Sequence, residues 1–437
     1  MKLTTDKIDL LKDKKFITQV IPSDNIIEKY DTIDALKMAE LVTLTDPTEA
    51  IEESIKTDED KYLIFTILKG GVIRWKYNKI STSGGEKTIQ YSRDKGETWV
   101  DWTSTTGGNK IDVVTGDIIY IKGNNSSYGV STTPPEYNGF TSTCQFAVSG
   151  TINALLGDQK MGANAFSNMF RDCTGLTSAP VLPATTLVDS CYNGMFSGCT
   201  SLTSAPVLPA TTLADSCYSD MFYNCTSLTV APELPVTTLA KSCYSNMFRG
   251  CTGLTSAPVL PATTLADGCY DSMFARCTGL TSAPVLPATT LASRCYSSMF
   301  QDCTGLTSAP VLPATTLADG CYDSMFIDCT SLVNAPELPA TELTKGCYMT
   351  MFSGCTSLTS APVLPATTLV EYCYRFMFRR CTSLNYIKCL ATDISSTSCT
   401  SSWTQNVSPT GTFVKKSGVE WTTDQNGIPD GWTVEEA

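Results

Sequence analysis

Residues 251–274 read CTGLTSAPVLPATTLADGCYDSMF, and residues 303–326 repeat them letter for letter. Variants of the same phrase fill 165–384, where its Met-Phe pair recurs at an unbroken step of 26 residues. The nine pairs begin at Met169, Met195, Met221, Met247, Met273, Met299, Met325, Met351 and Met377. A period of this length predicts a solenoid, in which each unit buries its apolar face only against its neighbours.

Each unit is expected to hold one helix and one extended segment. In one unit the apolar residues are Leu213, Cys217, Tyr218, Met221 and Phe222, a spacing typical of a helix. The prediction for the array is therefore an α/β repeat.

A capping pattern and two prolines mark the limits of these elements. Thr212 followed three residues later by Asp215 is a capping-box signature, which indicates a helix start. It recurs at Thr186/Asp189, Thr264/Asp267, Thr316/Asp319 and Thr368/Glu371. Because Pro206 and Pro209 cannot donate ladder hydrogen bonds, the extended segment should be a short, weakly paired strand.

The phrasing C-x-x-L…LP…L…CY-x-x-MF-x-x-C resembles the BspA-type leucine-rich repeat over about half of the chain. The unit is slightly long for that family and carries Met-Phe where Ala-Phe is commoner. The family is associated with surface adhesion and with proteins of gut bacteria such as Bacteroides and of their phages. The resemblance therefore implies a leucine-rich-repeat solenoid with a role at surfaces.

Composition limits the function classes. The 437 residues include 31 Lys and Arg, 43 Asp and Glu, and no His, which gives a formal net charge of −12. An acidic chain without a basic stripe is not expected to bind nucleic acid. The absence of His removes the commonest general base and metal ligand. No P-loop, dinucleotide turn or Cys-base pair is present, so we predict a non-enzymatic protein with no cofactor and no metal.

Residues 1–60 differ from the rest, with fifteen acidic residues against eight basic ones. Helix-like spacing over 5–15 and 32–44 predicts an acidic helical segment. We expect no export signal, because no charged start is followed by an apolar run, and no membrane span, because no 18-residue apolar run occurs. The segment is either a solvated appendage or an attachment module that docks on a larger assembly or mediates oligomerisation.

Residues 61–150 change to strand-like alternation. The strand candidates are 62–68, 71–77, 87–91, 111–114, 117–122 and 143–148, separated by Gly, Asn and Ser turns. Six short strands in so small a region predict a small all-β sandwich.

Within this region, Ser92 to Trp99 read SRDKGETW, which resembles the Asp-box turn of sialidase propellers. A propeller needs several copies and one is present, so we interpret it as a structural hairpin. The alternative is that Trp99 and Trp102 form an aromatic platform for sugars.

Seventeen of the twenty cysteines form two ladders in the array, one from Cys173 to Cys381 and one from Cys191 to Cys373. Within a helix the ladders would lie about 12 Å apart, too far for a disulfide. Buried free thiols are favoured over disulfides or metal. Outside the repeat, Cys389 and Cys399 are the one pair considered for a bridge.

The repeats differ most at the two residues after Met-Phe and at the residue before Cys-Tyr. These positions should form the exposed helix side and either drift freely or present a diversified binding face. The candidate anchors are Tyr223, Arg249, Arg276, Arg294, Tyr372, Arg379 and Arg380, because Tyr and Arg contribute strongly to interfaces.

A second column, on the strand side, holds six valines and is expected to be exposed, because Glu233 and Glu337 share it. These valines are Val181, Val207, Val259, Val285, Val311 and Val363. The strip could support self-association or be ordinary surface. Residues 151–384 should then comprise the solenoid, with 151–166 as its opening cap, and 385–437 a closing cap.

Three functions follow, in order of preference. The first is a bacteriophage virion protein, a tail or head fibre, whose array contacts a bacterial surface glycan or protein while other parts bind virion proteins. The second is a bacterial cell-surface adhesin that binds matrix or mucin. The third is a carbohydrate-active enzyme.

Overall fold

The computed structural model describes residues 17–20, 42–44, 57–78, 85–130 and 136–437. At the N-terminus, β1 (Ile17–Val20) pairs antiparallel with β2 (Val42–Leu44). The helix predicted over 5–15 lies outside the described residues, as does most of the one predicted over 32–44. Residues 42–44 of the latter form a strand, so the helix prediction is wrong there.

Two antiparallel sheets follow a short helix, α5 (Asp58–Lys61). The five-stranded sheet has the order β11 (Gln145–Gly150), β3 (Leu63–Lys69), β8 (Ile118–Gly123), β5 (Thr88–Ser92), β6 (Val100–Thr103). The four-stranded sheet has the order β7 (Asn109–Val113), β4 (Gly71–Asn78), β10 (Glu136–Ser142), β9 (Gly129–Val130). All six strand candidates are confirmed. Strands β6, β9 and β10 are additional.

The alternation that predicted these strands also builds their core. In β4, Ile73, Trp75 and Tyr77 are buried while the residues between them are not. Phe65 of β3 and Phe140 of β10 pack edge to face with ring centroids 5.0 Å apart, which joins the two sheets.

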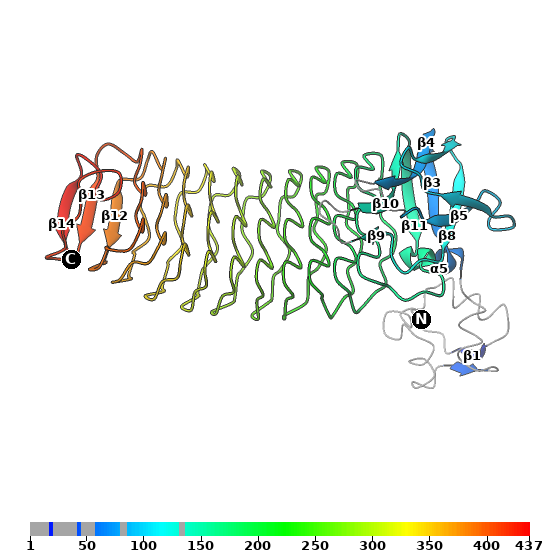
Figure 1. Cartoon of the computed structure of the whole chain (residues 1–437), viewed down its shortest axis with the longest axis horizontal. Coiled ribbons are helices and arrows are strands. Elements are labelled where there is room, and N and C mark those ends of the chain that lie inside the picture. The colour runs from blue at the N-terminus through cyan, green and yellow to red at the C-terminus, as the bar shows by residue number, and fades with distance from the viewer. Residues whose placement is uncertain (1–16, 21–41, 45–56, 79–84, 131–135) are drawn as a thin grey trace.

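The repeats form a long single file of coils beyond these sheets (Figure 1). The helix predicted in each coil is wrong: the segment is a succession of tight turns. Ser216, Asp220 and Asn224 have φ of 55°, 56° and 56°, and every coil repeats this left-handed residue at every fourth position. A right-handed helix cannot continue through such residues. The fold of the array is therefore a solenoid of turns and extended segments, not an α/β repeat.

Hydrogen bonds along the turns alternate between local and inter-coil partners. The Cys217 and Met221 N–H groups donate three residues back, to Ala214 O and Tyr218 O at 3.3 Å each. The intervening Tyr218 N–H donates instead to Cys243 O of the next coil, at 3.0 Å. Every second N–H thus ties one coil to the next, which satisfies the buried backbone without a helix.

The Asp of the supposed capping box also has an inter-coil role. Asp215 Oδ1 accepts the N–H of Lys241 at 3.1 Å, and Asp267 and Asp319 accept the equivalent N–H groups of Ser293 and Lys345. The pattern marks a contact between coils rather than a helix start.

The proline-containing segment is extended and weakly paired, as predicted. Its coils are joined by single parallel bridges such as Ser204 to Val230 and Thr238 to Thr264. The strand-side column is exposed as expected, and Val207, Val259 and Val311 are 81%, 79% and 78% exposed.

Aromatic ladders fill the interior of the turn segments. The Phe rings from Phe170 to Phe378 stack with centroids 5.7–5.9 Å apart. The Tyr rings from Tyr192 to Tyr374 form a parallel ladder. The core of the array is therefore two continuous columns of rings, flanked by the two cysteine ladders.

All twenty cysteines are buried and free, which confirms the thiol interpretation for the ladders. In the ladder from Cys173, each thiol reaches back to the preceding coil, as when Cys225 Sγ donates to Phe196 O at 3.1 Å. Burial raises the pKa of Cys225 to about 12. The bridge considered between Cys389 and Cys399 is wrong, since both are free.

The sheets close the first coil and three parallel strands close the last. Phe146 N–H donates to Gly175 O and Phe140 N–H to Met169 O, so β11 and β10 act as the preceding coil. Residues 151–166, expected to be the opening cap, begin with a single 3-10 turn (Ile152–Leu155) beside them. At the far end, β12 (Tyr386–Cys389), β13 (Thr412–Lys415) and β14 (Thr433–Glu436) form a parallel sheet.

The coil pattern continues past residue 384. Ser398, Ser402 and Asn406 are left-handed, and Tyr374 N–H donates to Cys399 O. The buried Trp403 then joins both aromatic ladders, 6.1 Å from the rings of Tyr374 and Phe378, and Trp421 stacks on it at 5.6 Å. The closing cap thus starts after one further coil.

Candidate recognition face

The outward residues of the turns form one long surface, which we call the turn face. It comprises, in each coil, the residue before Cys-Tyr, the two residues after Cys-Tyr and the two after Met-Phe. All seven predicted anchors lie on it. Arg276, Arg294, Arg379 and Arg380 are exposed, and Tyr223, Arg249 and Tyr372 are half-buried.

Four of these anchors occupy left-handed positions. Arg276, Arg294, Tyr372 and Arg380 have φ of 63°, 52°, 60° and 64°. Most coils fill these positions with Ser, Gly, Asn or Asp, which tolerate this conformation. For a long or aromatic side chain it costs about 1–2 kcal/mol. Backbone strain is a common mark of functional sites.

The structure brings three anchors together in one coil. Tyr372, Arg379 and Arg380 lie on the segment 372–380, where the chain also places Arg375 and Phe376. We call these five residues the arginine–aromatic cluster. Sequence comparison missed two of them, because the pair after Cys-Tyr was not among the positions compared. The signal was available in the sequence: Phe376 stands where other coils carry Gly, Ser, Thr, Asn or Asp.

The cluster is arranged by cation–π contacts. The Arg375 guanidinium lies 4.6 Å from the ring centre of Phe376 and 5.2 Å from that of Tyr372. The Arg379 guanidinium lies 5.4 Å from the centre of the same Phe376 ring. These rings hold two guanidinium groups near one another at the surface.

Charged neighbours frame the cluster. Arg380 Nη2 lies 3.6 Å from Asp328 Oδ1, and Lys345 Nζ lies 2.8 Å from Glu371 Oε2. That bond raises the pKa of Lys345 and lowers the pKa of Glu371. Among the described residues, neither Arg375 nor Arg379 has a carboxylate within 4.0 Å.

The other four anchors are spread over separate coils. Arg276 Nε pairs with Asp302 Oδ2 at 3.5 Å, and Arg249 Nη1 donates to Asn246 Oδ1 at 3.3 Å. Arg294 extends over Gly320 of the next coil. Tyr223 lies in the coil directly before that of Arg249, where the Asn224 N–H donates to Arg249 O at 2.7 Å. Among the described residues, no hydrogen bond, ion pair or ring contact joins the side chains of these four anchors.

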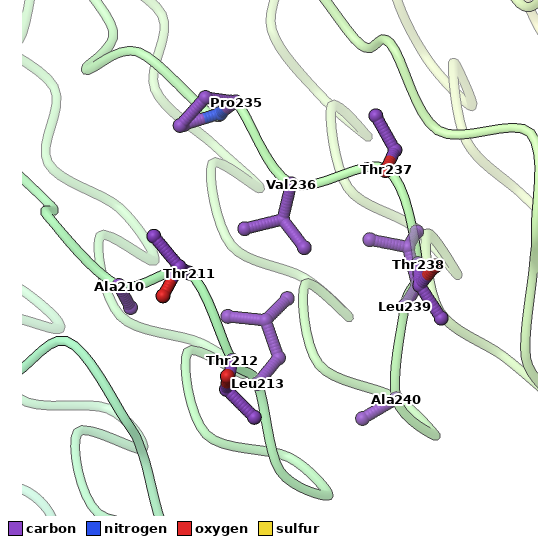
Figure 2. Close-up of a pocket in the computed structure, with 10 residues that line it drawn as sticks. All are labelled: Ala210, Thr211, Thr212, Leu213, Pro235, Val236, Thr237, Thr238, Leu239 and Ala240. Atoms are coloured by element: carbon purple, nitrogen blue, oxygen red, sulfur yellow. The ribbon is translucent and has the colours of Figure 1, made fainter.

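The proline side offers only shallow grooves. One, of about 460 Å³, lies between 210–213 and 235–240. Figure 2 shows Val236 projecting into it. Val236 stands where other coils bury an alanine, such as Ala262, and its larger side chain is only half-buried. The lining holds no ionisable side chain, so it offers no acid–base chemistry.

The Asp-box turn is a structural hairpin between β5 and β6. Asp94 Oδ1 accepts from Ser92 Oγ at 2.6 Å and from the Thr98 N–H at 2.9 Å. These bonds lower the pKa of Asp94 to about 2. Trp102 is buried and Lys122 lies 4.0 Å over Trp99, so the two tryptophans do not form the suggested sugar platform.

Neither a metal-binding cluster nor a membrane-spanning helix occurs in the described part of the chain. No cluster of three or more His, Cys, Asp or Glu there could hold a metal ion. No helix there is long and apolar enough to cross a membrane.

The stacked coils, two capped ends and a variable turn face define a leucine-rich-repeat-type solenoid of the recognition class. Comparison with known families agrees: the family described as BspA type Leucine rich repeat region matches residues 164–307 and 296–408, more than half of the chain. The protein therefore belongs to the BspA-type leucine-rich-repeat family. No curated protein and no solved structure matches it significantly.

Proposed function

We propose that this protein is a non-enzymatic recognition rod whose turn face binds a surface component of a bacterial cell, as part of a bacteriophage tail or head fibre. Membership of the BspA-type family supports a surface recognition role. The observation that carries the binding assignment is the arginine–aromatic cluster, which concentrates strained Tyr, Phe and Arg residues in one coil.

The backbone of the array suits this role. Inter-coil hydrogen bonds and the buried ring ladders fix each turn independently of its outward side chains. Outward residues can therefore change from coil to coil while the rod keeps its shape. The two sheets lie at one end of the rod (Figure 1), and turn-face residues such as Arg276, Arg294 and Arg379 are exposed.

The alternative is a bacterial surface adhesin that binds matrix or mucin through the same face. Both assignments use the same geometry and differ in the ligand. Virion proteins remain proposed partners of the N-terminal part, and self-association through the exposed valines remains a proposed property.

The test is binding of the labelled full chain to panels of intact gut bacteria, to mucin and to matrix proteins. The cluster variant carries Tyr372→Gly, Arg375→Ser, Phe376→Ser, Arg379→Ser and Arg380→Gly, each residue taken from the same position of another coil. The matched control carries Arg171→Ser and Asp172→Gly, in a coil that holds neither the cluster nor any other anchor, and both new residues again occur at these positions in other coils.

Saturable binding to a narrow set of bacteria, weakened at least tenfold in the cluster variant and unchanged in the control, would support the fibre. Binding to mucin or matrix with the same dependence would favour the adhesin. Binding that both variants retain, or that wild type lacks, would refute recognition through this face.

A further inference from the structure

The arginine–aromatic cluster departs from both coils beside it. Its left-handed positions hold Tyr372, Phe376 and Arg380, with φ of 60°, 57° and 64°. The coil before it holds Gly346, Thr350 and Gly354 there, and the coil after it holds Ser398, Ser402 and Asn406. Because both neighbours stack with small or polar residues, stacking does not require bulky ones.

Two guanidinium groups in this cluster are oriented but not neutralised. Arg375 lies against Tyr372 and Phe376, and its buried Nε has no hydrogen-bond partner among the described residues. Arg379 lies against Phe376 and is exposed. A guanidinium fixed on a ring presents its planar donors to an oxyanion, and its preferred partners are carboxylate, phosphate or sulfate groups.

The surroundings limit the charge density of the ligand. Asp328 and Glu371 lie on either side, held by Arg380 and Lys345. A nucleic acid, with one charge per about 1.7 Å of duplex, would bring phosphates against these carboxylates. A ligand with single anionic groups separated by neutral spacers meets the two unpaired arginines and avoids both acids.

Neutral hydroxyl groups flank the cluster along the rod. In the column of Phe376, the preceding coil places Thr350 and the following coil Ser402, both half-buried. A protein partner would need an interface of roughly 20–30 residues a side, with an apolar centre. This part of the turn face offers a small charged centre among hydroxyl groups instead, which suits a hydroxyl-rich chain.

We infer that the arginine–aromatic cluster is a binding subsite for an acidic polysaccharide, with Arg375 and Arg379 bound to a carboxylate, phosphate or sulfate group on one sugar. The inference rests on the proposed recognition function and names its ligand class. Thr350 and Ser402 are placed to bond the hydroxyl groups of the adjoining sugars.

The experiment measures affinity of the full chain for polygalacturonate, dextran sulfate, yeast phosphomannan and uncharged dextran, with poly-L-glutamate and single-stranded DNA as competing classes. The test variant is Arg375→Gln with Arg379→Gln. The control is Arg171→Gln, an exposed arginine at the same position of its coil as Arg379, which pairs with Asp172 at 3.7 Å and is not one of the anchors. Because Arg379 is exposed, Arg379→Lys supplies a second variant that does not touch the core.

We expect binding to at least one anionic glycan and none to dextran, weakened at least tenfold by the double variant, about threefold by Arg379→Lys, and less than twofold by the control. The anionic glycan that binds identifies the oxyanion. Equal loss in the control, tighter binding to poly-L-glutamate or DNA, or no binding to any anionic glycan would overturn the inference. If the protein bound cells through the cluster but bound none of the anionic glycans, this inference would be refuted and the proposed function would stand.

Discussion

The two sides of each 26-residue coil are held together in different ways. On the turn side, every second N–H bonds the next coil and the rings of Phe and Tyr stack without a gap. On the proline side, single bridges join the coils and valines are left in solvent. The turn side therefore contributes most of the stability, and its outward residues are free to vary because the inward ones fix the backbone.

The largest loss of stability should be seen at high pH, since the buried cysteine thiols of the array lie on the turn side. Burial raises the pKa of Cys225, Cys277 and Cys329 to about 12, from an ordinary value near 9. Their stabilising effect is complete below pH 9 and is lost as the pH rises towards 12, because the unfolded chain ionises first.

Each such thiol lowers the free energy of unfolding by about 1.4 kcal/mol per pH unit in that range. Calorimetric Tm measured between pH 7 and 11 should fall steeply above pH 9. Replacing Cys277 by Ala should make that fall shallower, because unfolding would then release about one proton fewer. A Tm that stayed constant to pH 11 would show that the ladder thiols are not buried as described.

Interrupting a ring ladder should give the next largest effect. Phe274 lies between Phe248 and Phe300 with centroids 5.7 and 5.8 Å away, and it is fully buried. Phe274→Ala should destabilise the array by about 3–5 kcal/mol, through lost contacts and a cavity. Urea unfolding followed by tyrosine fluorescence would measure it, and a loss below 1 kcal/mol would mean that the coils close over the gap.

The sequence predicted the strands of the first domain and the existence of the solenoid, but not the conformation of the turns. Alternation identified β3, β4 and β8 because each buries one face. In the repeat, Leu213, Cys217, Met221 and Cys225 are spaced by four, whereas a helix with 3.6 residues per turn drifts about 40° over each such step. The strict period of four was the sign of turns rather than of a helix.

A second sign lay between the apolar residues. Ser216, Asp220 and Asn224 are also spaced by four, and each residue type tolerates a left-handed conformation. Read together, the two series predict turns. The binding cluster was only partly predictable, since Tyr372, Arg379 and Arg380 vary visibly, whereas the contacts of Arg375 depend on where the turns place the rings.

Relieving strain on the turn face should give a smaller effect of opposite sign. Arg294 has φ of 52°, and its equivalents Gly268, Gly320 and Gly346 show what this position accommodates without cost. Arg294→Gly should raise stability by up to about 1 kcal/mol, because relief of the left-handed strain exceeds the entropy that glycine adds to the unfolded chain. The matched substitution Ala292→Gly, at a neighbouring position where the structure records no positive φ, should lower Tm instead. If both substitutions lowered it, Arg294 would owe its conformation to favourable contacts.

The smallest effect should come from the strand-side valines. Val285 is 75% exposed, and Glu233 and Glu337 occupy its column in other coils without disturbing the array. Val285→Ser should change the free energy of unfolding by less than about 0.5 kcal/mol, as surface substitutions usually do. The comparison with Phe274→Ala in the adjacent coil separates the two sides within one pair of experiments. Sedimentation velocity of the same variant adds a second readout. A dimer that dissociated on this substitution would show that the valine strip is buried between two copies. The proline side would then carry an interface of its own.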